Sequence, residues 1–421
     1  MKYGIVTIGS RGDVEPFIAL GKRLKRRGHH VRITTFRNFE DYIKTEGFEY
    51  TPLAGDAVEV IRLLIGENVS SLQYFRNLEK LLAPVKNEFL SDIEYACSGM
   101  DAILYSTLGS VALHVVEKLK IPCFRVFFCP LDPTGEFPAM TAPELPLGPL
   151  YNRLTFAVGD LLWTNFTRKN LNDWRQKNGL KKITAFSFPY RELNGHKIPT
   201  LYAYSSILAP KPPEWDNSKY VTGYWIRDLN DDWQPDKSLT AFLETGPKPI
   251  YIGFGSAVGG SFDKAIQIVL ESLKVTNQRA ILSSGWGNLK GQNLPGSVFQ
   301  IENVPHEWLF HHMAGVIHHG GAGTTAAGLR AGIPTAIVPF GGDQPYWGNR
   351  VHQLGAGPKP ILRKNLNVKN LSSAINQIVT DNQMINKAKL LGQQLQKEDG
   401  AENAVDIIEE FTLYKRNIFN V

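Results

Sequence analysis

Cysteine is scarce in this chain, and long hydrophobic runs are absent from it. The three cysteines (Cys97, Cys123 and Cys129) form no CxxC pair, so the sequence offers neither a disulfide framework nor a zinc site. No stretch reaches the roughly 18 consecutive apolar residues of a spanning helix, and the apolar run at residues 3–8 is too short for a signal peptide. We therefore expect a cytoplasmic protein that meets a membrane only from its surface.

Low-complexity tracts and internal repeats are also missing. The 421 residues carry a formal net charge of +6 and a pI of about 9.0, which suits an anionic partner such as a nucleotide, a phosphate or an acidic membrane. The densest basic run, residues 22–27, falls late in a predicted helix, where cations complement the helix dipole; peripheral membrane contact is the alternative interpretation. No basic–aromatic motif accompanies the charge, so we expect no nucleic-acid partner.

The periodicity of the chain predicts an α/β fold. An apolar strand at residues 3–8, a glycine loop, a helix ending at Gly28 and a strand at 31–35 form a βαβ unit, and the pattern restarts at residues 249–253. Two doubly wound, Rossmann-like parallel-sheet domains should therefore face each other across a cleft that binds the ligands. The expected division is an N-terminal domain at 1–215, a linker at 216–248, a C-terminal domain at 249–400, and a helix at 401–421 that packs back on the first domain.

Between residues 130 and 150 the periodicity disappears into a series of prolines. A long irregular stretch inside a compact domain is usually functional or a linker. Because aromatic residues flank it on both sides, we interpret it as part of an acceptor pocket, with residues 56–95 and 127–170 as the wider lining.

The strongest chemical signal follows the predicted strand at residues 315–318. There the chain reads His319-Gly320-Gly321-Ala322-Gly323-Thr324-Thr325, and a helix begins. Glycines allow a close backbone approach, and a helix start offers unpaired N–H groups and a positive dipole end. This pattern predicts a diphosphate site; a tight turn with threonine caps is the alternative. The proposed contacts are His319, Gly321, Gly323, Thr324 and Thr325.

One strand later, Asp343 and Gln344 stand side by side at a strand end. Asp343 would also serve as a helix cap, with Pro345 in the first turn. A carboxylate beside an amide suits paired contacts to sugar hydroxyls. We favour the sugar contact because the predicted diphosphate site ends the neighbouring strand.

These motifs together resemble the donor-binding signature of the UDP-glycosyltransferase superfamily. The sequence VPHEW at 304–308, HHGGAGTT at 318–325 and GDQP at 342–345 carry the resemblance, and the continuation is similar to the sterol glucosyltransferase and the bacterial glycopeptide and macrolide branches. The loop Gly9-Ser10-Arg11-Gly12-Asp13 also resembles the loop that opens these branches. The resemblance implies the two-domain GT-B fold.

The resemblance gives Asp13 the role of general base. A carboxylate in a partly dry cleft can accept the proton that an alcohol loses as its oxygen attacks the sugar. Ser10, Arg11 and Gly12 are then the loop at the cleft. A helix cap is the alternative for Asp13, and plant-type members use a histidine that this sequence lacks there.

The resemblance implies donor-binding roles for some residues of this chain, but not every position of the family's donor site has a match. Ser256 falls in the small loop that the family places near the diphosphate, and Val304 where backbone groups hold the nucleobase. Trp286 is our candidate for a missing aromatic contact to the base. Plant members carry a ribose-binding glutamate where this chain has Ala327, so this position leaves UDP against dTDP open; the resemblance favours UDP.

No Asp-x-Asp motif occurs in the chain, so we expect no metal and no cofactor. The leading hypothesis is an inverting, metal-independent transfer of a hexose, glucose by preference, from a nucleoside-diphosphate sugar to a lipophilic acceptor such as a sterol. The alternatives are a natural-product glycosyltransferase and a non-catalytic nucleotide-sugar-binding module. A nicotinamide dehydrogenase is disfavoured because residues 253–259 miss the GxGxxG spacing.

Overall fold

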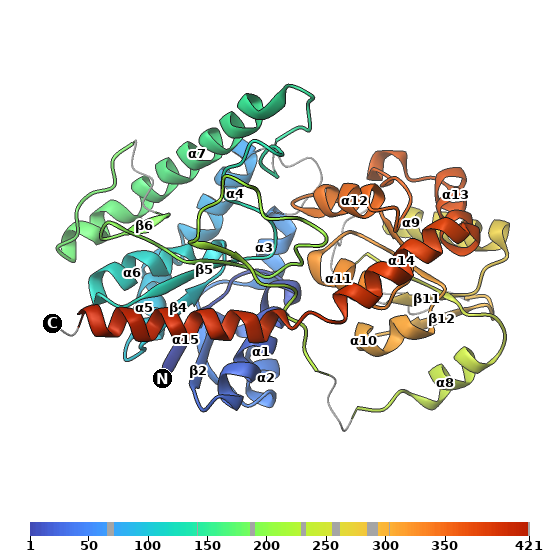
Figure 1. Ribbon diagram of the computed structural model, residues 1–421, viewed down its shortest axis with the longest axis horizontal. Coiled ribbons are helices and arrows are strands. Elements are labelled where there is room, and N and C mark those ends of the chain that lie inside the picture. Colours follow the sequence, from blue (N-terminus) through green and yellow to red (C-terminus); the bar gives the residue numbers. More distant parts are fainter. Residues whose placement is uncertain are drawn as a thin grey trace.

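The computed structural model describes residues 1–64, 71–140, 142–185, 190–228, 233–254, 262–283, 294–302 and 304–419. It shows two α/β domains side by side, the N-terminal one on the left of Figure 1 and the C-terminal one on the right. The predicted α/β class and the pair of parallel sheets are confirmed.

The N-terminal domain is built on a seven-stranded sheet in the order β3-β2-β1-β4-β5-β8-β9, with every pairing parallel. Its strands are short and mostly buried, as expected for a sheet covered by helices on both faces. They are β1 (Lys2–Val6), β2 (His30–Phe36), β3 (Glu49–Leu53), β4 (Ala102–Tyr105), β5 (Cys123–Phe127), β8 (Thr200–Tyr202) and β9 (Lys219–Val221).

Helices cover both faces of this sheet, and a small antiparallel pair, β6 (Glu192–Leu193) with β7 (His196–Lys197), lies beside it. The longest helix, α7, runs along the top of the domain in Figure 1. The helices are α1 (Arg11–Arg26), α2 (Glu40–Thr45), α3 (Ala57–Leu64), α4 (Ser71–Leu82), α5 (Lys86–Cys97), α6 (Ala112–Leu119) and α7 (Gly148–Lys177).

The C-terminal domain has the same α/β architecture, built on a five-stranded parallel sheet in the order β12-β11-β10-β13-β14. Its strands are β10 (Ile250–Gly253), β11 (Ala280–Ser283), β12 (Val298–Ile301), β13 (Gly315–His318) and β14 (Thr335–Ile337). Its helices are α8 (Lys237–Glu244), α9 (Phe262–Thr276), α10 (His306–Leu309), α11 (Ala322–Arg330), α12 (Gln344–Gln353), α13 (Val368–Thr380) and α14 (Asn382–Leu395).

The strand order changes direction between β1 and β4 in the first sheet and between β10 and β13 in the second. In open parallel sheets, ligands bind outside the carboxyl ends of the strands at such a switch point. The loop that carries Asp13 follows β1, and the loop that carries His319 follows β13. The topology thus places both predicted loops at switch points.

The segment between the domains is more structured than the expected linker at 216–248. β9 completes the first sheet, while Leu239 of α8 is buried against Tyr251 and Phe310 of the second domain. The prolines and aspartates that suppress periodicity here do not prevent one short strand and one capped helix from docking on opposite domains, so the crossing is confined to the residues between them.

The chain crosses back through α15 (Gly400–Phe419), which runs horizontally across the N-terminal domain in Figure 1, above α2 and β2. Ala401, Val405 and Ile408 are buried in that domain's core. The basic run at residues 22–27 holds this contact. Arg27 donates to Glu402 and, at 2.8 Å, to Glu409, and Arg23 pairs with Asp228 at 2.8 Å and Asp399 at 3.2 Å.

These ion pairs add tertiary partners to the basic run. Arg23, Lys25 and Arg26 lie in the last turn of α1, where the helix pattern places them, and the arginines also bind acidic groups of α15 and of the interdomain segment. Charges far apart in sequence are paired here by the fold, which no local pattern indicates.

Candidate active site

Asp13 lies in the first turn of α1, at the carboxyl edge of the first sheet. Ser10 is the N-cap residue, and its backbone N–H and hydroxyl donate to Oδ2 of Asp13 at 2.7 and 2.9 Å, which forms a capping box. The helix-cap alternative is therefore present, but it occupies one carboxylate oxygen only. Among the described residues, Oδ1 has no hydrogen-bond donor.

The loop around Asp13 is shaped for this carboxylate. A Cβ on Gly9, whose φ is +148°, would stand 2.2 Å from Oδ2 of Asp13. Burial raises the pKa of Asp13, and the hydrogen bonds from Ser10 offset part of that rise. A half-buried carboxylate with a raised pKa and one oxygen left over is suited to accept a proton.

The rest of this loop reaches toward the second domain. Gly12 donates its amide to Ser10 Oγ at 3.2 Å, and exposed Arg11 pairs with Glu15 at 3.4 Å. Burial lowers the pKa of His306 on α10 to about 4, and the charge of Arg11 contributes to that shift. The charge of Arg11 therefore acts on a residue of the C-terminal domain.

The loop from β13 into α11 has the geometry of an anion site. Gly321 is the N-cap residue of α11 and supplies no side-chain cap, so the first amides of the helix keep their hydrogen-bonding capacity. Gly320 has a φ of +96°, and a Cβ on Gly321 would stand 2.7 Å from Nε2 of His319. Gly323 is exposed at the helix start, and Thr324 beside it is half-buried.

Thr325 and His319 differ in what they can offer to a diphosphate. Thr325 is fully buried and donates its hydroxyl to the carbonyl of Gly321 at 2.9 Å, so its proton is used inside the helix rather than offered to a diphosphate. Burial lowers the pKa of His319 to about 4, so the imidazole is neutral at pH 7. A backbone hydrogen bond to Gly253 opposes part of this shift, and the ring brings no positive charge to the site.

The sugar-side pair is ordered by contacts of α12 and of the loop that precedes it. Oε1 of Gln344 accepts from the amides of Phe340 and Gly341 at 2.7 and 3.2 Å. Its amide nitrogen has no partner among the described residues and remains a donor. Asp343 makes no cap bond; instead, Trp347 donates its indole N–H to Oδ2 at 2.8 Å.

The two carboxylates influence each other across the cleft. Burial raises the pKa of Asp343 to about 6, the bond from Trp347 partly opposes that rise, and the negative charge of Asp13 adds to it. Cys129 lies near both of them: burial raises the pKa of its thiol, and both carboxylates contribute. The structure thus brings the predicted base and the predicted sugar contact into one site.

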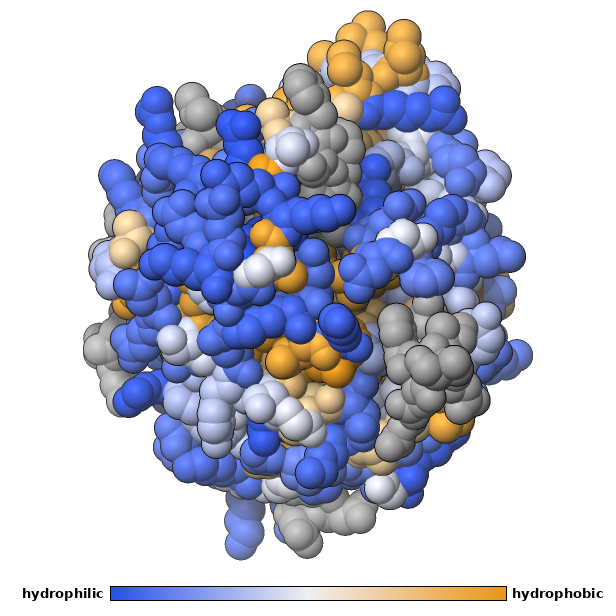
Figure 2. Space-filling view, turned by 90° about the vertical axis from the view of Figure 1, so that its left-hand side faces the viewer, coloured by the Kyte–Doolittle hydropathy of each residue, from blue (hydrophilic) through white to orange (hydrophobic). Residues whose placement is uncertain are grey.

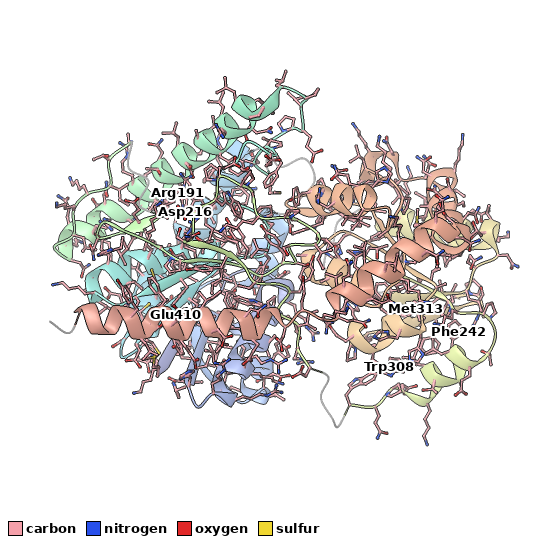
Figure 3. The ribbon with its side chains drawn as sticks, in the orientation of Figure 1. Arg191, Asp216, Phe242, Trp308, Met313 and Glu410 are labelled. Atoms are coloured by element: carbon pink, nitrogen blue, oxygen red, sulfur yellow. The ribbon has the colours of Figure 1, made fainter. Side chains whose placement is uncertain are left out.

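The nucleobase side is only partly described. Neither backbone group of Val304 has a hydrogen-bond partner within the described residues, so both can serve a ligand. Ser256 and Trp286 lie outside the described residues. Trp308 of the same motif packs against Trp233 and His312 with ring centroids 5.1 and 4.4 Å apart, on the α8 side of the domain (Figure 3).

A cavity of about 200 Å³ opens inside the N-terminal domain. Most of its lining is apolar, and Ile8 and Leu108 bring it to the carboxyl edge beside the Asp13 loop. The negative charge of Asp13 also contributes, after burial, to raising the pKa of Tyr74 on α4 to about 12. Further lining residues are Phe36, Val60, Leu78, Phe89, Val111, Trp163, Phe166 and Leu171.

The cavity corrects our interpretation of the proline-rich stretch. The ranges 56–95 and 127–170 do supply lining residues, but none of the described residues between 130 and 150 does. That stretch instead meets the second domain, where Phe137 packs on Tyr346 at 5.3 Å and Glu144 accepts from Asn349 at 2.9 Å. Among the described residues no His, Cys, Asp and Glu cluster could hold a metal ion, and no helix is long and apolar enough to cross a membrane.

Two family models match the chain. Residues 3–138 match the glycosyltransferase family 28 N-terminal domain, and residues 270–410 match the C-terminal domain of erythromycin biosynthesis protein CIII-like proteins. A sterol 3-beta-glucosyltransferase from Arabidopsis thaliana is 39% identical over 96% of this chain and 64% of its own length. One from Yarrowia lipolytica is 37% identical over 99% of this chain and 29% of its own length.

The solved structure of the glycosyltransferase of kitacinnamycin superposes with a TM-score of 0.73 at 18% identity, covering 97% of this chain and 98% of its own. The chain belongs to the GT-B glycosyltransferases. The resemblance inferred from the sequence is thereby confirmed, together with the GT-B fold. The chain spans less than two thirds of the length of these curated relatives.

Sequence reasoning missed Trp347 and Cys129 in the cleft and His114 in the cavity. Trp347 follows Asp343 by four residues, which places both on one face of α12, so the spacing is a usable signal. Cys129 follows a buried strand closely, as cleft residues of parallel sheets do. His114 has no such signal, because its partner Arg175 is 61 residues away.

Proposed function

We propose that the chain is an inverting, metal-independent hexosyltransferase. It transfers glucose from a nucleoside-diphosphate sugar, UDP-glucose in preference to dTDP-glucose, to a hydroxyl of a sterol-like acceptor. The observation that carries the proposal is that Asp13 and Asp343 lie near enough for the charge of Asp13 to raise the pKa of Asp343, in a protein that also offers an apolar cavity beside the Asp13 loop and an uncapped start of α11. The sterol 3-beta-glucosyltransferases from Yarrowia and Arabidopsis support glucose and a sterol as the transferred groups.

The reaction is a single displacement. Oδ1 of Asp13 takes the proton of the acceptor hydroxyl while the hydroxyl oxygen forms its bond to the anomeric carbon. On the opposite face, the bond between that carbon and the diphosphate oxygen breaks, and its electron pair leaves with the diphosphate. The proton ends on Asp13, and the configuration at the carbon is inverted.

The leaving diphosphate is stabilised by the start of α11. Its first amides and its positive dipole end favour the developing charge, and His319 stands beside them as a neutral ring. On the sugar side, Gln344 donates through its amide and Asp343 accepts through its second oxygen. These contacts need no metal ion and no cofactor.

We further propose that the protein is cytoplasmic and collects its lipophilic acceptor at a membrane surface. The first half of α7 carries Leu150, Leu154 and Val158 at successive turns, and these side chains are 82%, 60% and 49% exposed. Figure 2 shows hydrophobic side chains gathered at the top of the molecule, where α7 lies in Figure 1. The same helix lines the cavity one turn further on, at Trp163.

The test is a transfer assay read by mass spectrometry. UDP-glucose and dTDP-glucose are each offered with a panel of sterols, macrolide aglycones and flavonoids, with and without EDTA. Transfer to sterols that survives EDTA supports the proposal. A strict need for magnesium or manganese, or transfer to the aglycones alone, would contradict it.

The base is tested on the same assay with Asp13→Asn. Because the amide cannot accept the proton, kcat should fall roughly 10²–10⁴-fold while nucleotide affinity stays close to wild type. The matched control is Asp41→Asn, which changes an exposed aspartate on α2 and should leave kcat intact. A D13N enzyme with a third of wild-type kcat would reject Asp13 as the base, and nucleotide binding without any transfer by the wild type would indicate a binding module.

A further inference from the structure

One polar side chain of the apolar cavity has no role in the proposed reaction. His114 on α6 lines the cavity and is only 1% exposed. Its Nδ1 lies 2.8 Å from NH1 of Arg175, itself 4% exposed. The guanidinium of Arg175 is held by Glu117 at 2.6 and 3.0 Å and by the carbonyl of Lys181 at 2.8 Å.

These contacts determine where the imidazole carries its proton. A guanidinium group has donors and no acceptor, so Nδ1 of His114 must accept, and the proton must reside on Nε2. Burial and the charge of Arg175 lower the pKa of His114 to about 3, so the ring stays neutral at physiological pH. His114 therefore presents Nε2–H as a fixed donor.

This N–H group has no hydrogen-bond partner among the described residues. The polar atoms around it are used by one another: Tyr190 donates to the hydroxyl of Thr167, which donates to the carbonyl of Trp163 at 2.9 Å. Buried polar groups are nearly always hydrogen-bonded, and one that is not gains from any ligand atom that accepts its proton.

His114 lies on the wall of the cavity, away from its carboxyl edge. α6 leaves the carboxyl end of β4, which pairs with β1 and lies next to the Asp13 loop, and runs back along the sheet. Leu108 lines the cavity at that edge, and His114 follows it by six residues, which is roughly 9 Å of helix. An acceptor whose hydroxyl meets Asp13 would place its far end near His114.

We propose that His114 selects acceptors that carry a second oxygen at the end opposite the glycosylated hydroxyl. A ketone, ester carbonyl or hydroxyl there accepts the proton of Nε2–H, whereas a hydrocarbon end leaves it unpaired. The proposal rests on the proposed function, in which this cavity holds the acceptor. It narrows the acceptor to oxygenated sterols and steroids.

The test uses two 3-hydroxysteroids that differ only in a ketone at C17, the far end of the ring system. Their affinities are measured without donor, by the tryptophan fluorescence to which Trp163 in the cavity contributes, and their kcat/KM with UDP-glucose. The wild type should prefer the ketone by roughly ten-fold in both. Equal use of the two steroids, or no binding of either, would overturn the proposal without any variant.

Two variants separate recognition from structure. His114→Leu removes the donor and should abolish the preference, chiefly by lowering the affinity and the kcat/KM for the steroid that carries the ketone. His114→Gln keeps an N–H donor and should retain part of it. Thermal unfolding and nucleotide affinity report on the fold of each variant.

The competing explanation is that Nε2–H faces the ring of Tyr190, whose centroid lies 6.1 Å away at an interplanar angle of 74°. In that case the preference would be absent in the wild type and unchanged in H114L. Transfer to both steroids at equal rates would then remove this inference and leave the proposed function standing. Binding of the steroids with no transfer would instead count against the function.

Discussion

Asp13 and Asp343 occupy equivalent positions in the two domains, but different contacts hold them in place. Each carboxylate stands at the start of a helix at the carboxyl edge of a sheet, and burial raises the pKa of each. Each has Oδ2 fixed by an N–H group. For Asp13 that group belongs to Ser10 in the same turn, whereas for Asp343 it belongs to Trp347.

The difference lies in what fixes the donor. Trp347 is fully buried and packs edge-on against Tyr204 of the N-terminal domain, with ring centroids 5.5 Å apart. Nearby, Arg350 donates to the carbonyl of Leu208 at 2.7 Å, again across the domain boundary. Both donors are therefore local in sequence, but the donor to Asp343 is also held in place by the packing of one domain on the other.

Trp347→Phe should have the largest effect, because it removes the donor that distinguishes Asp343 from Asp13. Phenylalanine keeps the ring contact but removes the indole N–H, so Asp343 loses its fixed orientation and kcat/KM for the nucleotide sugar should fall about ten-fold. The bond from Trp347 lowers the pKa of Asp343 in the wild type, so its loss should raise that pKa. The acid limb of the pH profile should then move to higher pH. Kinetics with UDP-glucose across pH 5–8 measure both effects.

Tyr204→Phe is the matched control for that variant. The Tyr204 hydroxyl has no hydrogen-bond partner in the described part of the chain, so this change preserves the ring packing and the Asp343 bond. It should leave the pH profile unchanged. An acid limb that stayed in place in W347F, or moved equally in Y204F, would separate Trp347 from the ionisation of Asp343.

The same contrast explains how much of the site can be predicted from sequence. The Asp13 loop and the His319 loop consist of neighbouring residues whose glycines, caps and strand–helix junctions fix the local backbone. Their residues alone therefore indicate ligand sites. The bond from Arg175 to His114 and the ion pairs of Arg27 join residues far apart in the chain, and no short pattern encodes them.

Two elements escaped prediction for a physical reason. The 30 residues of α7 are apolar on the cavity side and again on the outer side at Leu150 and Leu154, so no single stripe of period 3.6 appears. In the interdomain segment, β9 is only three residues long and gains its stability from pairing with β8. Both depend on tertiary partners rather than on local periodicity.

Gln344→Glu tests the contact of Gln344 to the donor sugar separately from its contacts to the loop. The carboxylate can still accept from the amides of Phe340 and Gly341, so the loop is preserved, but the N–H donor is lost. Preference for glucose over a deoxy or epimeric hexose should fall several-fold, because the site no longer pairs that hydroxyl. Free UDP affinity should change little.

A donor panel and a UDP titration on one preparation test this variant. Gln344→Ala is the companion variant, since it removes both the donor and the loop contacts and should lower UDP affinity as well. A collapse of UDP affinity in Q344E with an unchanged donor ranking would mean that Gln344 serves only the loop.

The smallest expected effect concerns stability and follows from the raised pKa of Asp343. The folded protein binds this proton more tightly than the unfolded chain does, because the pKa is about 6 against an ordinary 3.8. The carboxyl group therefore contributes its full stability below pH 3.8 and loses it as the pH rises through 6. Above that pH its buried charge is a cost, which we place on the order of 1–2 kcal/mol because the group is still partly exposed.

Asp343→Asn removes this charge and tests the cost directly. The variant should melt a few degrees above the wild type at pH 8, while at pH 4 the two proteins should melt together. The Asp41→Asn variant of an exposed aspartate should show no such pH dependence. A D343N protein that melted below the wild type at pH 8 would contradict this prediction. It would mean that the hydrogen bond from Trp347 stabilises the ionised carboxylate by more than burial of the charge destabilises it.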